Sequence, residues 1–277
     1  MWERLLVGVD GSECGWVAAR LAGELARRFG SRVVLVNVVH IPAEWLGSIS
    51  GVPAGAMDSR MVGWGRQMSE EVLDRGISYF GGVEVERRSE LGHPLGVLLH
   101  LARHGVDLVV VGTRGRSELE AFLLGSTSDG LVHHAPCSVL LVRERAGESP
   151  EHPLGKLLVA VDGSPLSRQA VQVSAEVARR FGSQVLLLHV LEPGRRRSTA
   201  ARILAEAQAA LADCGCPVQT RLAQGRPEEH IVQVAAAEGA DLVALGSRGV
   251  GTVQALLMGS VSDRVAHHAP CPVLIVR

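Results

Sequence analysis

The stretch Leu5-Leu6-Val7-Gly8-Val9-Asp10-Gly11-Ser12 runs from an apolar segment into an Asp-Gly-Ser turn, and its last four residues recur as Val161-Asp162-Gly163-Ser164, 152 residues later. The stretch Ala26-Arg27-Arg28-Phe29-Gly30-Ser31 recurs at the same offset, beginning at Ala178. Near the end of each copy, His-His-Ala-Pro-Cys stands at 133–137 and again at 267–271, an offset of 134. Such a period is too long for a solenoid repeat and predicts two copies of one domain.

The two offsets differ by 18 residues, so the first copy carries an excess of that length. The excess falls largely between about 40 and 65, where Gly, Ser, Pro and Met are frequent. Whether segment 41–63 is a lid, an oligomer contact or disordered stays open. The polar stretch 143–155 contains two prolines and is typical of a linker. We therefore expect domains at 1–144 and 154–277.

Short β-branched runs alternate with longer amphipathic segments in both halves, and the central runs are apolar on both faces. This pattern is typical of a parallel sheet with helices on both sides. The expected strands are 4–10, 33–39, 83–88, 107–112 and 138–142, then 156–162, 184–190, 217–222, 241–246 and 272–276. The expected helices are 15–29, 65–79, 94–104 and 126–134, then 166–181, 198–213, 227–238 and 260–268. We predict two tandem doubly wound, Rossmann-like α/β domains of five strands each.

Composition excludes several classes of protein. The 277 residues carry 28 basic and 29 acidic side chains, a net charge of −1, and only 3% are aromatic. This balance offers no general attraction to nucleic acid or to an anionic membrane. No run has the length of a membrane span and the N-terminus lacks a signal-peptide core, so we expect a cytoplasmic protein. Five cysteines without a framework spacing predict reduced thiols, with Cys214-x-Cys216 read as a helix-end turn rather than a redox or metal fragment.

Two glycine-marked strand ends are the candidate site. Asp10-Gly11-Ser12 follows the first expected strand and Gly112-Thr113-Arg114-Gly115 follows the fourth. With strand order 3-2-1-4-5 these strands are neighbours at the point where the order reverses, and ligands of open α/β sheets bind there. The two signals therefore converge on one crevice.

The second signal extends to Gly112-x2-Gly115-x9-Gly125-Ser126, and the second half has Gly246-x2-Gly249-x9-Gly259-Ser260. Glycines there allow positive φ and let backbone N–H groups approach an anion, and the following helix is expected to point its N-terminus at the same place. The alternative is that the glycines only turn the chain and Gly-Ser only caps a helix. A Walker A loop is excluded because the only lysine is Lys156.

Asp10 and Asp162 need a role away from phosphates, which a carboxylate would repel. An acceptor at the end of the first strand suits a ribose hydroxyl or a base amino group. The alternative is an Asx-turn that begins the next helix.

These motifs resemble the universal stress protein family in its tandem two-domain form, over nearly the whole chain. The resemblance rests on Val-Asp-Gly-Ser, on Gly-x2-Gly-x9-Gly-Ser and on the His-Ala-Pro-Cys before the last strand. It implies strand order 3-2-1-4-5, an adenine nucleotide in each intact pocket, and domains paired through their final strands. The nine-residue gap is characteristic of members that bind ATP. The long segment after the second strand departs from the family pattern and leaves the openness of the first pocket undecided.

Carried over by position, the resemblance assigns an adenosine end and a phosphate end to each half. In the first half the adenosine end is Val9, Asp10 and Val38, and the phosphate end is Gly112, Arg114, Gly115, Gly125, Ser126, Thr127 and Ser128. In the second half the corresponding sets are Val161, Asp162 and Val190, then Gly246, Arg248, Gly249, Gly259, Ser260, Val261 and Ser262.

Other features are given smaller roles. Adjacent helical residues diverge by about 100°, so neither His133-His134 nor His267-His268 is expected to hold a metal ion. Cys137 and Cys271 are expected to be small core residues. The run Arg195-Arg196-Arg197 either forms a solvated loop or extends its side chains to phosphates of the second pocket.

The leading hypothesis is an adenine-nucleotide binding regulatory protein that signals through occupancy by ATP, AMP or ADP, with or without Mg²⁺. The alternatives are a weak ATPase or phosphotransferase, and an interaction scaffold with relic pockets. No catalytic residue is evident, so at most slow ATP hydrolysis is expected. The apolar final strands, 138–142 and 272–276, predict an intrachain pseudo-dimer, because exposed edges of that composition need a partner. A homodimer and an unknown protein partner are further expectations.

Overall fold

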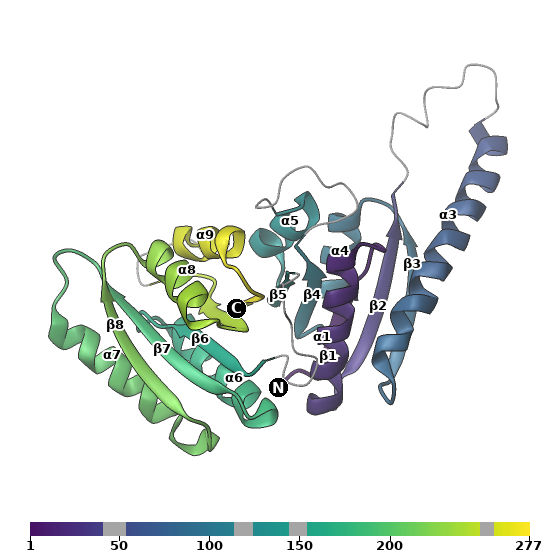
Figure 1. Ribbon diagram of the computed structural model, residues 1–277. Helices are drawn as coiled ribbons and strands as arrows, with labels where there is room; N and C mark the ends of the chain where they lie inside the picture. Colours follow the sequence, from purple (N-terminus) through teal and green to yellow (C-terminus); the bar gives the residue numbers. More distant parts are fainter. Residues whose placement is uncertain (41–53, 114–123, 144–153, 250–257) are drawn as a thin grey trace.

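The structure, a computed structural model, describes residues 1–40, 54–113, 124–143, 154–249 and 258–277 (Figure 1). Strands and helices alternate in both halves. In the first half they are β1 (Arg4–Gly8), α1 (Glu13–Phe29), β2 (Arg32–Val39), α3 (Ala54–Ile77), a 3-10 turn η1 (Ser78–Phe80), β3 (Val85–Leu91), α4 (Pro94–Ala102), β4 (Leu108–Gly112), α5 (Ser126–His134) and β5 (Ser138–Val142). In the second they are β6 (Lys156–Ala160), α6 (Pro165–Phe181), β7 (Gln184–Leu191), α7 (Arg197–Ala210), η2 (Ala212–Cys214), β8 (Val218–Gln224), α8 (Pro227–Glu238), β9 (Leu242–Gly246), α9 (Ser260–His268) and β10 (Val273–Val276).

All ten strands form one sheet in the order β3-β2-β1-β4-β5-β10-β9-β6-β7-β8. Within each half the pairing is parallel with order 3-2-1-4-5, so the predicted topology is confirmed. The final strands meet in an antiparallel pair, with Leu140 opposite Leu274. The expected pairing of the apolar last strands within one chain is therefore confirmed, and neither strand is left as an exposed edge.

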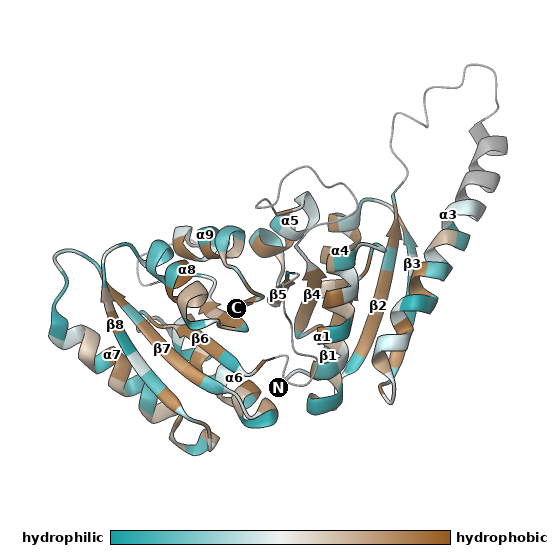
Figure 2. Cartoon of the chain, viewed as in Figure 1, coloured by the Kyte–Doolittle hydropathy of each residue, from teal (hydrophilic) through white to brown (hydrophobic). Residues whose placement is uncertain are grey.

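Alternation along each central strand builds two apolar layers. Leu5 and Val7 lie in one layer and Leu6 in the other, because successive side chains of a strand point to opposite faces. Each layer runs through both halves, since Leu157 shares the layer of Leu5 and Leu158 that of Leu6. Figure 2 shows apolar central strands, whereas the edge strands β3 and β8 carry polar residues. That composition suits strands with one unpaired side.

The repeated motifs lie at the ends of helices α1 and α6. Ser12 is the N-cap of α1 and its hydroxyl accepts from Gly15 N at 3.1 Å, as Ser164 does from Ser167 N in α6. Both helices end at a glycine of the second motif, in left-handed conformation. The repeats therefore set where these two helices begin and end.

Helix α3 is the largest departure from the expected elements. It begins at Ala54, eleven residues before the expected start, and so takes up part of segment 41–63. Residues 41–53 lie outside the described residues. Figure 1 shows α3 projecting past the end of β2. Trp64, in this helix, is 70% exposed.

The two halves also meet where α1 and α6 end. The Arg28 guanidinium lies 4.4 Å from the Phe181 ring, and the Arg180 guanidinium lies 4.6 Å from the Phe29 ring. Arg28 and Arg180 each donate to the other's backbone carbonyl. The repeated Arg-Arg-Phe motif therefore packs against its own copy about a local two-fold axis.

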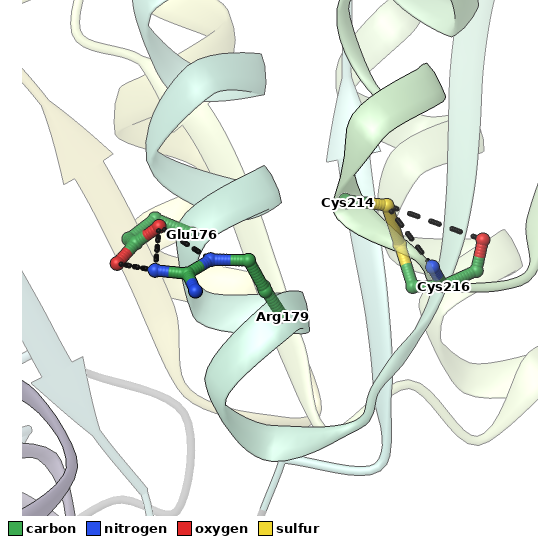
Figure 3. Close-up of a disulfide and its surroundings, with 4 residues drawn as sticks. All are labelled: Glu176, Arg179, Cys214 and Cys216. Atoms are coloured by element: carbon green, nitrogen blue, oxygen red, sulfur yellow. Dashed lines mark hydrogen bonds and ion pairs between the residues drawn. A yellow bond between two sulfur atoms is a disulfide. The ribbon is translucent and has the colours of Figure 1, made fainter.

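The double variant Arg28→Ala/Arg180→Ala is expected to lower the free energy of unfolding by about 1–3 kcal/mol. It removes two cation–π contacts and two hydrogen bonds between the halves, together with the ion pairs of Arg28 to Glu24 and of Arg180 to Glu176 within each helix. Arg179→Ala is the matched control, since Arg179 is more exposed and pairs only with Glu176 of its own helix (Figure 3). It should cost less than about 0.5 kcal/mol. Chemical denaturation measures both. Equal stability of the double variant and the control would contradict this account of the contact.

The expectation that all cysteines are reduced is wrong for one pair. Cys214 and Cys216 form a disulfide with their Cα atoms 5.4 Å apart (Figure 3). The 3-10 turn η2 and the positive φ of Gly215, 67°, double the chain back and bring the two sulfurs together. Cys14 and Cys137 are free thiols.

Candidate functional site

The Asp-Gly-Ser turns lie at the carboxyl ends of the first strand of each half. Asp162 Oδ1 accepts from Ser164 N at 2.9 Å, and Asp10 Oδ1 accepts from Ser12 N at 3.0 Å. Gly163, with φ of 81°, supplies the left-handed residue of the turn. The Asx-turn that the sequence left as an alternative is therefore present in both halves. It uses one carboxylate oxygen.

The second carboxylate oxygen of Asp162 points at the other motif. A Cβ placed on Gly249 would lie 2.6 Å from Asp162 Oδ2. The two glycine-marked strand ends of the second half thus meet, as the strand order requires. A side chain at 249 would displace the carboxylate.

The described members of the glycine loop do not use the positive φ that glycine allows. Gly125 and Gly259 have φ of −65° and −75°, and Gly112, Gly246 and Gly249 lie outside the positive range. Glycine is required at 112 and 246 for a different reason, because the backbone there packs so closely against helices α1 and α6 that no room is left for a Cβ. A Cβ on Gly246 would lie 2.8 Å from Leu166 Cβ, and one on Gly112 would lie 2.8 Å from the backbone carbon of Cys14.

Helices α5 and α9 begin directly after this loop, with Gly125 and Gly259 as N-caps and no side-chain cap. The first amides of a helix lack intrahelical partners and carry the positive end of its dipole. Ser128 Oγ donates to Gly112 O at 2.7 Å, and Ser262 Oγ donates to Gly246 O at 3.0 Å. These two hydroxyls hold the loop, so a contact from either residue to an anion would use its backbone N–H.

A cavity of about 610 Å³ opens at the carboxyl ends of β6, β7 and β9. This volume is typical of small-molecule sites. All ten second-half residues singled out from the sequence line it: Val161, Asp162, Val190, Gly246, Arg248, Gly249, Gly259, Ser260, Val261 and Ser262. The structure brings them to one place.

The cavity has walls that the sequence analysis missed. His189 lines it from β7, Thr199 and Ile203 from α7, and Ile231 from α8. His189 Nδ1 lies 2.7 Å from Val161 O, and at the matching position Asn37 Nδ2 donates to Val9 O at 2.7 Å. These two polar residues hold the end of the first strand of each half, directly before the aspartate. The sequence could have indicated them, because each is a polar residue inside an otherwise apolar strand.

Arginines surround the cavity mouth. Arg195 and Arg196 are exposed and line it, as does Arg248. Two further arginines of the lining are engaged locally: Arg168 donates to Gly163 O at 2.7 Å, and Arg202 pairs with Glu206 at 2.5 Å. The lining also includes Asp162, Glu192 and Glu206, so arginines outnumber carboxylates there, and this excess of positive charge favours an anionic ligand.

In the first half the same elements place Val9, Asp10, Val38, Gly112, Gly125, Ser126, Thr127 and Ser128 at the corresponding strand and helix ends. Arg114 and Gly115 lie outside the described residues. The position after the second strand differs, because His40 stands where the second half has Glu192, with its ring 5.5 Å from that of His93.

The two core cysteines offer no nucleophile. Cys271 is buried, and burial raises the pKa of the Cys137 thiol to about 11. At neutral pH Cys137 therefore remains protonated.

Two parallel five-stranded α/β domains, each with glycine-marked strand ends where the strand order reverses, define a tandem protein of the doubly wound class. The family model described as the universal stress protein family matches residues 1–143 and 153–277, and the chain belongs to this family. Among the described residues, none of the helices has both the length and the apolarity to cross a membrane.

The comparisons extend over the whole chain. Universal stress protein Rv2623 of Mycobacterium tuberculosis is 27% identical over 293 residues, covering 99% of this chain and 96% of that protein. Universal stress protein Rv2005c of the same organism is 34% identical over 187 residues, 62% of each chain and so less than two thirds of that relative's length. The crystal structure of a universal stress protein from Archaeoglobus fulgidus has a TM-score of 0.76 at 22% identity, covering 100% of this chain and 99% of that one, and shows the same fold.

Proposed function

We propose that this universal stress protein binds an adenine nucleotide, ATP in the first instance, and that occupancy of its pockets is the signal it transmits. The observation that carries the proposal is the 610 Å³ cavity of the second half, where both motifs meet. The first half carries the same motifs and is proposed to hold a second nucleotide.

The phosphate end of the pocket is proposed to be the loop before α9. Backbone N–H groups of Ser260, Val261 and Ser262 stand at the helix N-terminus, where the dipole favours negative charge. Arg248 stands beside this loop, with its Cα 3.5 Å from a Cβ built on Gly259, and Arg195 and Arg196 line the same cavity just before α7. Amide donors and guanidinium groups together match the oxygens and charge of a polyphosphate.

The nucleoside end is proposed to lie against Val161, Val190 and Ile203, whose apolar side chains line the cavity. A base is flat and largely apolar on its faces, so these side chains suit it. Asp162 Oδ2 is the acceptor of this region that the Asx-turn does not use. It suits a ribose hydroxyl or a base amino group, both of which donate.

Binding is favoured over phosphoryl transfer by the position of the only lysine. Lys156 stands at the start of β6, at the end of the strand opposite the cavity, and its ammonium pairs with Glu238 at 2.7 Å. It is therefore not available to neutralise charge on a transferring phosphoryl group. Mg²⁺ would enter with ATP as its counter-ion.

Asp162→Asn is expected to weaken ATP binding by about 10–100-fold, because a hydrogen bond from the nucleoside to a charged acceptor is lost. Binding of inorganic triphosphate should be unchanged or stronger. The amide retains a carbonyl oxygen for the Asx-turn, so the loop keeps its shape. Isothermal titration with ATP and with triphosphate, each with and without Mg²⁺, measures this. Asp213→Asn, an exposed aspartate in η2, is the control. Equal loss of both ligands would show that Asp162 serves the loop and does not contact the nucleoside.

A further inference from the structure

Helices α5 and α9 bring four side chains together across the two halves. Asp129 and His133 come from α5, and Asp263 and His267 come from α9, each pair four residues apart and so on one face of its helix. His133 Nε2 lies 3.4 Å from Asp263 Oδ1, and His267 Nε2 lies 3.5 Å from Asp129 Oδ1. Ligand atoms of Asp129, Asp263 and His267 all lie within 4.8 Å of one another. The cluster is reciprocal about the local two-fold axis.

The other ring nitrogen of each histidine fixes where its proton lies. His133 Nδ1 is 2.9 Å from Asp129 O, and His267 Nδ1 is 2.9 Å from Asp263 O. A backbone carbonyl only accepts, so Nδ1 carries the hydrogen and the lone pair of the neutral ring is on Nε2. Each Nε2 then faces a carboxylate oxygen of the other half. At both positions a ring nitrogen and a carboxylate oxygen, which can each only accept a hydrogen bond, face each other. A cation between the two atoms would bind both of them.

We propose that His133, His267, Asp129 and Asp263 form a site for a divalent transition-metal ion of the zinc class. Three of these ligands already converge, and His133, whose Nε2 lies 3.4 Å from Asp263 Oδ1, would complete the tetrahedral set of two imidazole nitrogens and two carboxylate oxygens that Zn²⁺ accepts. Two carboxylates balance the charge of the ion. A zinc-binding histidine usually donates its second ring N–H to a carbonyl or carboxylate, as both rings do here. The side chains are 24–44% exposed, so an ion can reach them.

The expectation that the histidine doublets hold no metal rested on finding no carboxylate that recurs at ligand spacing beside them, and on the divergence of the two members of one doublet. The second argument stands for His133 with His134, but the structure joins one member of each doublet instead. The overlooked signal is Asp-x3-His, at 129–133 and again at 263–267. Only the antiparallel meeting of β5 and β10 brings the two copies face to face.

A metal ion at this site would tie α5 to α9, the two helices that follow the glycine loops of the two halves. The site uses none of the residues proposed to contact nucleotide, so the metal proposal can be tested independently of the proposed function. Its expected effect is to stabilise the contact between the halves.

The test is titration of the metal-free full chain, without nucleotide, with zinc sulfate by calorimetry. The wild type is expected to bind about one zinc per chain at micromolar concentration and to gain thermal stability. His133→Gln/His267→Gln should weaken binding by about 100-fold or more, equal to about 2.7 kcal/mol. The matched control His134→Gln/His268→Gln removes the exposed members of the same doublets and should bind as the wild type does.

The isosteric pair Asp129→Asn/Asp263→Asn is a second test that keeps side-chain size and should also lose zinc, with far-UV circular dichroism verifying the fold of every variant. A wild type that binds no zinc at micromolar concentration would overturn the proposal and leave protonation of Nε2 to resolve the facing acceptors. Binding that persists in the folded His133→Gln/His267→Gln variant would overturn it as well, because the zinc would then lie elsewhere.

Discussion

Gly249→Val is expected to remove about one nucleotide equivalent per chain, weakening the second pocket by more than about 100-fold, equal to about 2.7 kcal/mol. Any Cβ at this position would lie 2.6 Å from Asp162 Oδ2, and the valine methyl groups would fill the space between the loop and the carboxylate. The substitution therefore disturbs the proposed phosphate and nucleoside ends together. The fold should survive, because the contacted atom is the tip of a side chain that can rotate.

Calorimetric titration with ATP gives the stoichiometry and the affinity. Gly96→Val is the matched control, because a side chain at Gly96 would meet open space on α4. By spacing, Gly115→Val is the counterpart in the first half, at a position outside the described residues. Wild-type stoichiometry in Gly249→Val would show that the space beside Asp162 is not used by a ligand.

Gly246→Ala is expected to lower the free energy of unfolding by about 1–3 kcal/mol or more, although it adds a single methyl group. That methyl carbon would lie 2.8 Å from Leu166 Cβ, 2.9 Å from the Leu166 carbonyl carbon and 3.0 Å from Ser167 N. The backbone there is held by the cap of α6, in which Ser167 N donates to Ser164 Oγ. Neither neighbour can move without opening the start of the helix.

Urea denaturation of Gly246→Ala and of its first-half counterpart Gly112→Ala measures this cost. Gly96→Ala provides the contrast, since a methyl group on this first-turn residue of α4 would meet open space and alanine favours the helix, so the variant should be at least as stable as the wild type. A Gly246→Ala variant as stable as the wild type would show that β9 and α6 are not packed as closely as described.

The order of the elements followed from the sequence because hydrophobic periodicity and helix caps are local properties. The helix expected at 227–238 has those bounds, with Pro227 at its start and Gly239 at its end. Strand β1 ends at Gly8 rather than at residue 10, because the Asx-turn of Asp10 takes up the next residues. The early start of α3 at Ala54 was not predicted, since glycine and serine in that segment favour loops over helices.

The candidate site was predicted at the level of residues and less well at the level of their roles. Spacing placed Gly246 and Gly249 in one loop, but the need for glycine there comes from α6 and Asp162, which are distant in sequence. Ser128 and Ser262 were assigned to the phosphate end, and their hydroxyls donate to backbone carbonyls. Thr199 and Ile203 had no motif to mark them, because an apolar or hydroxyl contact from a helix can be supplied by many residue types.

Contacts between the two halves also could not be predicted from the sequence. The repeated Arg-Arg-Phe motif showed duplication, but nothing in it showed that Arg28 would meet Phe181. Such pairs follow only from the two-fold relation that the β5–β10 pairing sets up.

The most direct test of the central claim is mass analysis of small molecules released by acid from the purified protein, followed by titration of the emptied protein with ATP. The account predicts that an adenine nucleotide is released, or that the emptied protein binds added ATP, and the masses will distinguish ATP, ADP and AMP. A protein that releases no nucleotide and also fails to bind added ATP would contradict the account.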